Sequence, residues 1–147
     1  MLRRHLAFAL DPVLWAHEEL NFTPDPWQES LLRSNARRII LCCARQSGKS
    51  TIVALKALHR AIYDPGSLIL LVSPSLRQSS ELFRIVTTFF GQLDSPIGPE
   101  QESALRLTLE NRSRLVSLPG KEQTVRGFSG VDLLVIDEAA RVQSDLY

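Results

Sequence analysis

The chain contains 147 residues, 44% of them apolar and 22% charged, and its formal net charge is +1. This length and composition predict one soluble domain with a sizeable apolar core. The small net charge excludes a whole-surface attraction to nucleic acid, so any such binding has to be local. No stretch approaches the roughly 20 apolar residues of a membrane span, and the apolar run near the N-terminus is too short for a signal peptide. We therefore expect a cytoplasmic protein that makes no contact with membranes.

The N-terminal part of the chain predicts helices separated by proline-containing breaks. Residues 1–20 have a helical spacing of apolar positions, which is interrupted at Asp11-Pro12. A stiff turn then precedes a short helix that begins near Trp27. We therefore expect an N-terminal helical segment over residues 1–22 and a second unit over residues 23–147.

A possible phosphate-binding loop follows. The apolar run of residues 39–43 predicts the first core strand, and the apolar stripe of residues 52–62 predicts a helix. Residues 48–51, with the sequence Gly-Lys-Ser-Thr, lie between them, in the strand–loop–helix context that such a loop needs. Backbone N–H groups of the loop and the positive end of the helix would surround a phosphate.

Individual side chains of this loop have separate expected roles. Lys49 would add a mobile positive charge for the outer phosphates, and Ser50 would offer its hydroxyl to Mg²⁺. Two features are unusual. Cys43 stands where the usual pattern has its first glycine, and Arg45-Gln46 place a cation where most such loops carry small residues. A helix N-cap with a lysine nearby is the alternative, so this motif alone leaves the function open.

Beyond the loop, the pattern predicts a buried strand, a helix and a hairpin. Residues 68–72 form a continuous apolar run typical of a buried strand, and residues 76–93 predict a helix. Residues 94–103 predict a polar loop. Alternating apolar positions in residues 105–118 predict a hairpin with its turn at Asn111-Arg112.

An apolar strand that ends in two carboxylates supplies the second strong signal. Residues 133–136 read Leu-Leu-Val-Ile and are followed directly by Asp137 and Glu138. Open α/β sheets place their chemistry beyond the carboxyl ends of such strands. Asp137 would hold Mg²⁺ directly or through water, and Glu138 would polarise a water against the γ-phosphate. An N-cap followed by a first-turn acid is the alternative, but the two motifs in this order and spacing favour nucleotide hydrolysis.

These motifs give the chain a resemblance to a known family. It resembles the ATPase domain of the large terminase subunit, the motor that packages DNA into phage capsids. The resemblance implies an α/β fold of the P-loop NTPase class (ASCE type), a three-layer sandwich with a mostly parallel sheet. In terminases the phosphate loop characteristically lacks the first glycine and carries an arginine, so both unusual features fit. The resemblance rests on Trp27-Gln28, residues 44–51, residues 73–79, and residues 126–130 followed by the strand end at 137–140.

The resemblance also implies roles for the matching positions. Gln28, beside Trp27, would read adenine through paired hydrogen bonds, although Trp27 is equally well explained as a core aromatic. Arg45 would reach the γ-phosphate as charge develops there, with a salt bridge to a nearby carboxylate as its alternative. Asp137 would be the acid on the metal side and Glu138 the catalytic base. The implied cofactors are ATP and Mg²⁺. The implied nucleotide-binding residues are Trp27, Gln28, Arg45, Gln46, Ser47, Gly48, Lys49, Ser50 and Thr51.

Three further residues are candidates for contacts outside the subunit's own nucleotide. Arg126 lies in a glycine-flanked loop and is our candidate for an arginine offered to the nucleotide of a neighbouring subunit in a ring. A solvated loop cation is the alternative. Arg77 and Gln78 follow the second strand, where related motors contact the DNA backbone, and a polar helix start explains them equally well.

The sheet implied by the resemblance needs one more strand. In such folds the strand after the acidic one lies between it and the phosphate-loop strand, and the chain reaches Tyr147 before that strand. We therefore expect a sheet that is incomplete at the C-terminus, with a gap or a non-native pairing between residues 39–43 and 132–137. The coupling strand and the nuclease domain of the family would both be missing. Unpaired strand edges would make this chain poorly active and prone to aggregate.

The leading functional interpretation is the ATP-binding and ATP-hydrolysing part of a motor that packages double-stranded DNA. The implied partners are double-stranded DNA, further copies in a homo-oligomeric ring on a portal, and a small terminase subunit. A helicase-like DNA translocase is the first alternative, and an inactive prophage-derived remnant is the second. Arg45-Gln46 inside the loop and the stretch of residues 126–130 favour the terminase.

Overall fold

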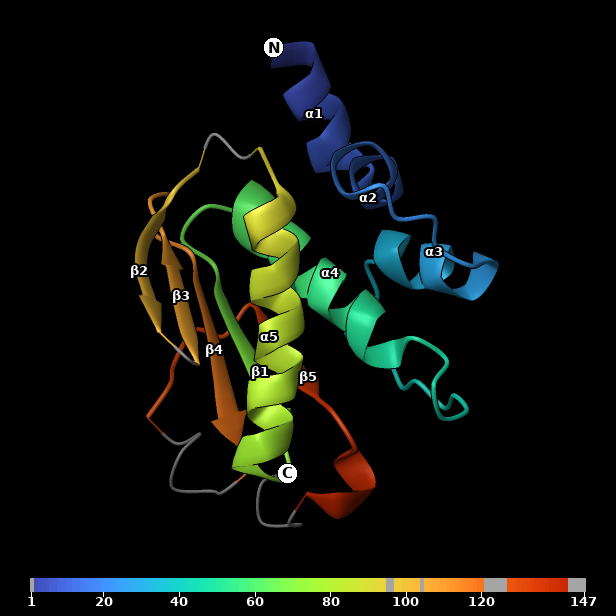
Figure 1. Cartoon of the computed structure of the whole chain (residues 1–147), viewed down its shortest axis with the longest axis vertical. Helices are drawn as coiled ribbons and strands as arrows, with labels where there is room; N and C mark the ends of the chain where they lie inside the picture. The colour runs from blue at the N-terminus through green and yellow to red at the C-terminus, as the bar shows by residue number, and fades with distance from the viewer. Residues whose placement is uncertain (1, 95–96, 104, 121–126, 143–147) are drawn as a thin grey trace.

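A mixed sheet forms the centre of the molecule, with the strand order β2-β3-β4-β1-β5 (Figure 1). The computed structural model describes residues 2–94, 97–103, 105–120 and 127–142. Strand β1 pairs in parallel with both β4 and β5, whereas β3 pairs antiparallel with β2 and β4. The strands are β1 (Leu68–Ser73), β2 (Pro99–Ser103), β3 (Arg106–Leu109), β4 (Arg114–Pro119) and β5 (Leu133–Ile136).

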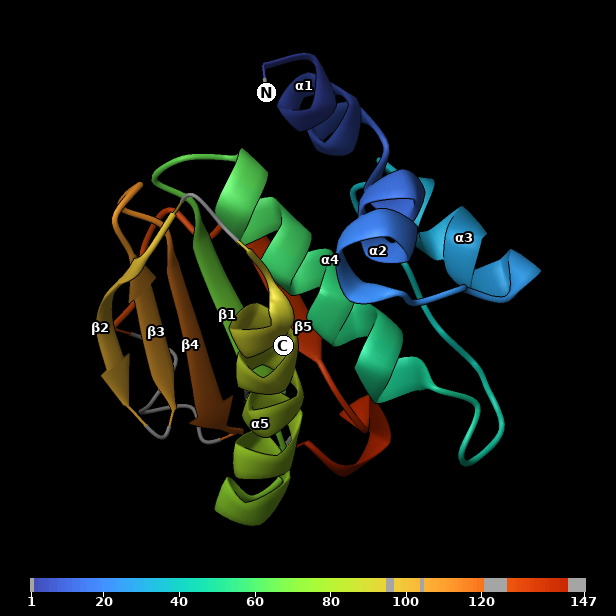
Figure 2. The same ribbon diagram turned by 45° about the horizontal axis from the view of Figure 1, so that its top comes forward.

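Two long helices cover one face of this sheet, and three shorter helices pack beside them. Figures 1 and 2 both show the N-terminal helices next to α4, on the side of the molecule away from the β3–β4 hairpin. A short 3₁₀ turn, η1 (Ala139–Arg141), follows β5. The helices are α1 (Leu2–Leu10), α2 (Pro12–Leu20), α3 (Pro26–Arg33), α4 (Lys49–Tyr63) and α5 (Leu76–Gln92).

Most of the expected elements are confirmed. The break at Asp11-Pro12 separates α1 from α2, because the Asp11 carboxylate accepts hydrogen bonds from the backbone of Val13 and Leu14 and so caps α2. The hairpin turns at Asn111-Arg112, where Arg112 has a φ of 71°. The side chain of Asn111 donates to the carbonyl groups of residues 61 and 62, which ties this turn to the end of α4.

The core lies mainly between the sheet and the helices. Every residue of β1 is buried, as expected for a central parallel strand with neighbours on both sides. On the helical face, α4 contributes Ile52, Leu55 and Leu58, each with no exposed surface. A smaller apolar cluster on the sheet consists of Leu68, Leu70, Val116 and Leu118, with Phe128 packed against it.

A buried histidine attaches the N-terminal helices to α4. The ring nitrogen Nε2 of His59 lies 2.8 Å from the carbonyl oxygen of Phe8, and the ring packs against Trp15 and Tyr63. Burial lowers the pKa of His59, so the neutral ring is favoured in this position. Trp15 itself is only 1% exposed. In the described part of the chain, none of the helices combines the length and the apolar character needed to cross a membrane.

The prediction of a polar loop over residues 94–103 is wrong in its second half. Residues 99–103 form β2, which pairs antiparallel with β3 at the edge of the sheet. Its sequence, Pro-Glu-Gln-Glu-Ser, has no apolar alternation, because an edge strand can be held by backbone hydrogen bonds to one neighbour rather than by burial of its side chains.

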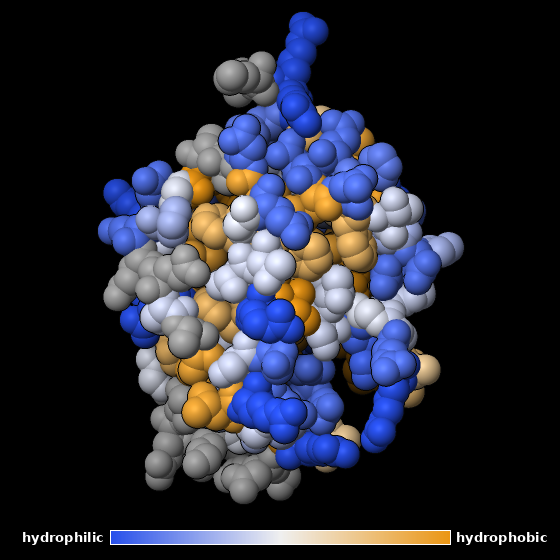
Figure 3. Space-filling view, in the orientation of Figure 1, coloured by the Kyte–Doolittle hydropathy of each residue, from blue (hydrophilic) through white to orange (hydrophobic). Residues whose placement is uncertain are grey.

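The prediction of a core strand over residues 39–43 is also wrong. This segment is irregular, and Ile40 is 94% exposed and Ile39 42% exposed. The physical reason is that the described part of the chain contains no partner strand for this segment, and a strand needs a neighbour for its backbone hydrogen bonds. The segment stands off the sheet, which leaves a hollow at the lower right of Figure 3.

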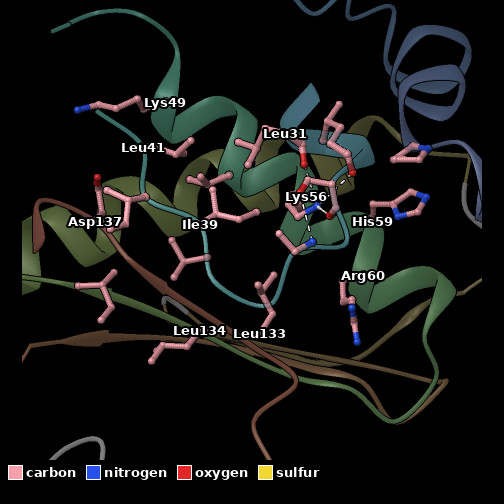
Figure 4. A pocket seen from close by; sticks show the side chains of 18 of the residues that line it. Leu31, Ile39, Leu41, Lys49, Lys56, His59, Arg60, Leu133, Leu134 and Asp137 are labelled. Carbon is pink, nitrogen blue, oxygen red and sulfur yellow. Dashed lines mark hydrogen bonds between the residues drawn. The ribbon is translucent and has the colours of Figure 1, made fainter. Parts of the chain in front are cut away.

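The expected gap in the sheet is confirmed. Strand β5 lies at the end of the strand order, and no described strand pairs with its outer side. A cavity of about 1570 Å³ is lined by residues 39–43 on one side and by residues 132–137 on the other. Figure 4 shows the segment with Ile39 and Leu41 on one side of this space and the strand that carries Leu133 and Leu134 on the other.

The open edge of β5 predicts self-association through that edge. Leu134 is 48% exposed on β5, and an unpaired apolar strand edge is a template for another chain. We expect Leu134→Lys to shift the protein toward monomer in sedimentation velocity measured over a concentration series. Leu6→Lys, which replaces a leucine of α1 that is 60% exposed, is the matched control and should leave the distribution unchanged. Equal effects of both substitutions would show that general surface hydrophobicity, and not the strand edge, drives association.

Candidate functional site

The loop before α4 has the backbone geometry of an anion-binding site. Gly48 is the N-cap residue of the 15-residue helix α4, with a φ of 81° and a ψ of 18°, and no side chain of the described residues caps this helix end. Gln46 also has a positive φ of 59°. The first N–H groups of a helix lack partners within the helix and carry a partial positive charge. This end of α4 is therefore suited to a negatively charged group.

The side chains of the loop fit a phosphate. The hydroxyl oxygen of Ser47 is buried and has no hydrogen-bond partner among the described residues. Within the same part of the chain, no ion pair to Lys49 is present, although its charge lies at the start of α4. Ser50 and Thr51 are half-buried in the first turn of α4. An orphaned hydroxyl, an unpaired ammonium group and an uncapped helix end together form a donor set of the kind that holds a nucleotide phosphate with its Mg²⁺.

The two carboxylates lie on the same cavity as this loop. Asp137 directly follows β5, and its backbone N–H donates to the carbonyl of Val72 at 2.8 Å. Lys49 and Arg45 line the cavity together with Asp137 and Glu138. Figure 4 shows Lys49 and Asp137 toward the same end of this space. The fold therefore brings together two motifs that lie far apart in the sequence.

Glu138 is held in place by neighbours on two elements. The side-chain amide of Gln78, in the first turn of α5, donates to its carboxylate at 2.9 Å. The hydroxyl of Ser75 in turn donates to the amide oxygen of Gln78 at 2.9 Å, which fixes the orientation of that amide. Arg141 lies 3.6 Å from the same carboxylate. Glu138 has a φ of 50°, a left-handed conformation that is uncommon for a residue other than glycine.

The structure separates the two candidates for DNA contacts. Gln78 is half-buried and bonded to Glu138, whereas Arg77 is exposed. No hydrogen bond or ion pair engages the Arg77 side chain within residues that the structure describes. Arg77 is thus available to a partner in solution, while the amide of Gln78 is already engaged.

Gln28 lies against the phosphate loop. It is 5% exposed, its side-chain oxygen accepts from the backbone N–H of Asp25 at 2.8 Å, and its side-chain nitrogen lies 3.5 Å from the carbonyl oxygen of Ser47. Trp27 is half-buried and packs against the main core.

The remaining loop candidates are at the surface or outside the described residues. Arg45 and Gln46 are exposed. Arg126 lies outside the residues that the structure describes.

Lys56 is a residue of this region that the sequence reasoning missed. Its ammonium group donates to the carbonyl oxygens of Leu31, Leu32 and Ser34 at 2.9, 3.1 and 2.9 Å, which caps the C-terminal end of α3 (Figure 4). Burial lowers its pKa. Its position four residues after Ile52, beside the apolar stripe of α4, was the available signal. A lysine on a buried helix face needs acceptors nearby.

Comparison with known proteins supports this description. Residues 40–147 match the family model described as RNA cytidine acetyltransferase NAT10/TcmA, helicase domain. Among curated proteins, the large terminase subunit of Thermus phage G20c is 29% identical over 144 residues, which cover 85% of this chain and 30% of that protein. The large terminase subunit of Thermus virus P23-45 is 28% identical over the same shares. The chain thus spans under a third of the length of these relatives.

Solved structures show the same fold. The large terminase ATPase domain of Thermus phage P74-26 superimposes with a TM-score of 0.79 and 23% identity, over 91% of this chain and 61% of that one. A variant of the same domain gives a TM-score of 0.81 at the same identity and coverage. The expected resemblance and the expected α/β fold of the P-loop class are confirmed, with the β2–β3–β4 hairpin strands adding antiparallel pairings to the parallel ones.

The contacts of Lys56 predict a large effect of its loss on stability. We expect Lys56→Met to lower the free energy of unfolding by about 2 kcal/mol, because it leaves carbonyl groups of α3 without their charged donor. Arg60→Met, one turn along α4, removes an ion pair with Asp64 whose side chains are 47% and 52% exposed, and should cost about 0.5 kcal/mol or less. Urea denaturation followed by circular dichroism measures both. Equal losses would show that Lys56 does not anchor α3.

Proposed function

The chain belongs to the family of the NAT10/TcmA helicase domain, and we propose that it is the ATP-binding and ATP-hydrolysing part of a motor that packages double-stranded DNA. The observation that carries this proposal is the shared cavity. The phosphate loop at the start of α4 and the carboxylates at the end of β5 line the same space. The curated relatives, which are named as large terminase subunits, support the choice of packaging motor among nucleotide-driven machines.

Residues of the loop would bind the triphosphate. The backbone at the start of α4 and the orphaned hydroxyl of Ser47 would donate to phosphate oxygens, and Lys49 would neutralise the outer phosphates. Ser50 and Asp137 would hold Mg²⁺, which supplies charge neutralisation at the transferred phosphoryl group. Arg45 is exposed at the loop and would add positive charge from the same subunit.

Glu138 would act as the general base. A carboxylate that accepts a proton from an attacking water has to be aimed at that water, and its present partners are Gln78 and Arg141. Hydrolysis would therefore involve some rearrangement of these contacts. Arg126 remains our candidate for an arginine donated to the nucleotide of a neighbouring subunit.

The partners and the assembly belong to this proposal as well. We propose that the complete protein forms a homo-oligomeric ring on a portal, works with a small terminase subunit and moves double-stranded DNA. The exposed Arg77 beyond β1 would contact the DNA backbone. Residues 1–22 would form a helical segment that packs on the ATPase unit of residues 23–147. We propose that this chain alone is a weak ATPase, because a large cavity lies between residues 39–43, which lead into the phosphate loop, and the strand that carries the acids.

A helicase-like DNA translocase is the second candidate, and the helicase domain in the description of the matched family favours it. The two functions differ in what they do to a duplex. A translocase that separates strands would release a labelled strand from a forked duplex, whereas a packaging motor would hydrolyse ATP on blunt double-stranded DNA without strand release. An inactive remnant would not hydrolyse ATP, whether or not it binds nucleotide.

Substitutions at the two motifs test the proposed hydrolysis. We expect Lys49→Ala to abolish detectable binding of Mg²⁺·ATP, and Glu138→Gln to bind ATP normally while turnover falls by about 10²–10⁴-fold. Calorimetry and a phosphate-release assay, on this chain and on a version extended by its native downstream sequence, give both values. A wild-type protein that binds no ATP in either form, or a Glu138→Gln variant with full turnover, would rule out the proposed roles.

The neighbouring residues Arg77 and Gln78 should separate DNA binding from hydrolysis. Arg77→Ala should weaken binding of double-stranded DNA. The slope of log K for DNA binding against log salt concentration should become smaller in magnitude by about one, while ATP turnover without DNA stays unchanged. Gln78→Ala should change ATP turnover, because Glu138 loses its donor, and leave DNA affinity within about twofold. Fluorescence anisotropy over a salt series and phosphate release are the measurements. The reverse pattern would assign Gln78 to DNA.

A further inference from the structure

Gln28 lies next to the peptide group that joins Ser47 and Gly48 in the phosphate loop. Its side-chain nitrogen lies 3.5 Å from the carbonyl oxygen of Ser47 and 2.8 Å from the place where a Cβ atom would stand at Gly48. Its side-chain oxygen is occupied by the backbone N–H of Asp25. Both ends of the amide are thus in contact with the protein's own backbone.

The geometry of a peptide group turns this contact into an effect on the loop. In a trans peptide the C=O and the N–H point in opposite directions. A Ser47 carbonyl that faces Gln28 therefore leaves the N–H of Gly48 on the side of the loop away from Gln28. Because Gly48 has no side chain and sits at a φ of 81°, this peptide can rotate more readily than one that precedes a residue with a Cβ atom. A rotated peptide would turn a carbonyl oxygen, instead of an N–H donor, toward a bound anion.

Helix α3, which carries Gln28, is attached at its start to the phosphate loop and at its end to α4. At its N-terminal end, α3 touches the loop through Gln28, and at its C-terminal end it is capped by Lys56 of α4 through three hydrogen bonds. The loop leads directly into α4, so α3 spans from the phosphate loop to the second turn of the helix that follows it. A helix held in this way has little freedom to move away from Gly48.

We propose that Gln28 is a positioning residue that holds the Ser47–Gly48 peptide with its N–H directed toward the phosphate site. The proposal rests on the proposed binding of a nucleotide by this loop. It adds a role to Gln28 that does not involve a base, because the oxygen and the nitrogen of its amide each already face a backbone group of the protein. Gln28 then contributes to affinity for any ligand that carries the same phosphates, whatever base is attached.

The test compares ligands with and without the adenine base. Gln28→Met keeps the length of the side chain and removes the donor. We expect it to weaken binding of Mg²⁺·ATP, Mg²⁺·GTP and Mg²⁺·tripolyphosphate by one common factor of about tenfold, measured by calorimetry on the full chain. Gln92→Met makes the same exchange at an exposed site near the end of α5 and should leave all three affinities within about twofold.

Each outcome of this experiment has one meaning. A loss confined to ATP would assign Gln28 to adenine and overturn the proposal, as would affinities equal to those of the wild type. If the wild type binds none of the three ligands, the proposed function fails, independently of the role of Gln28. If the wild type binds the three ligands and Gln28→Met does not change their affinities, the inference fails and the proposed function stands.

A measurement on the wild-type protein covers the case in which Gln28→Met does not fold. The side-chain amide protons of Gln28 should show a nuclear Overhauser effect to an α-proton of Gly48, because the Gln28 nitrogen lies 2.8 Å from the place where a Cβ atom would stand at Gly48. The same contact should persist when tripolyphosphate is added. Absence of this effect in a spectrum that resolves both residues would overturn the proposal.

Discussion

The burial of α4 between the sheet and the N-terminal helices is the constraint on which the site depends. One side of α4 packs through residues such as Leu55 against β1 and its neighbours, and another side receives α2 and α3. Because the buried positions of α4, between residues 52 and 62, pack on these neighbours, the start of the helix at Lys49 has a defined place relative to the carboxyl ends of β1 and β5. The hydrogen bonds of His59 to Phe8 and of Lys56 to α3 fix the orientation of the N-terminal helices on α4, which apolar packing alone does not. An anion site at a helix end needs such support, since its donors are backbone groups that move only with the helix.

Local patterns were enough to predict those parts of the molecule whose structure is decided locally. Strands β1 and β5 are continuous apolar runs. The hairpin turn was predictable because Asn111-Arg112 are polar residues between two segments of alternating apolar positions. The candidate phosphate loop and the Asp137-Glu138 pair could be predicted because residue type and spacing express the expected chemistry directly. The rule that parallel strands present their carboxyl ends together accounts for the place of Asp137 and Glu138 after β5. It does not account for the place of the loop, because residues 39–43, which lead into it, are not a strand.

The errors share a different cause, which is dependence on a partner distant in the sequence. Residues 39–43 have the composition of a buried strand, but composition cannot supply the neighbour that a strand requires, and Ile40 is left exposed. Strand β2 shows the opposite case, since a polar sequence becomes a strand because β3 offers a free edge. The partners of Gln28 and Lys56 could not be predicted either, because each contact joins α3 to a segment about twenty residues away in the sequence.

The unusual composition of the loop can be connected to these contacts. The position of the usual first glycine, Cys43, lies in an irregular segment that approaches the loop from outside the sheet, whereas Gly48 is tightly constrained by Gln28. Backbone freedom is therefore required at the end of the loop next to α4 and not at its beginning. An arginine at position 45 is tolerated for a related reason, since the loop interior at this point is exposed and its side chain does not compete with core packing. In this chain the proposed cradle for a phosphate would be shaped from the side of α3 and α4, which would leave the first half of the loop free to carry charge.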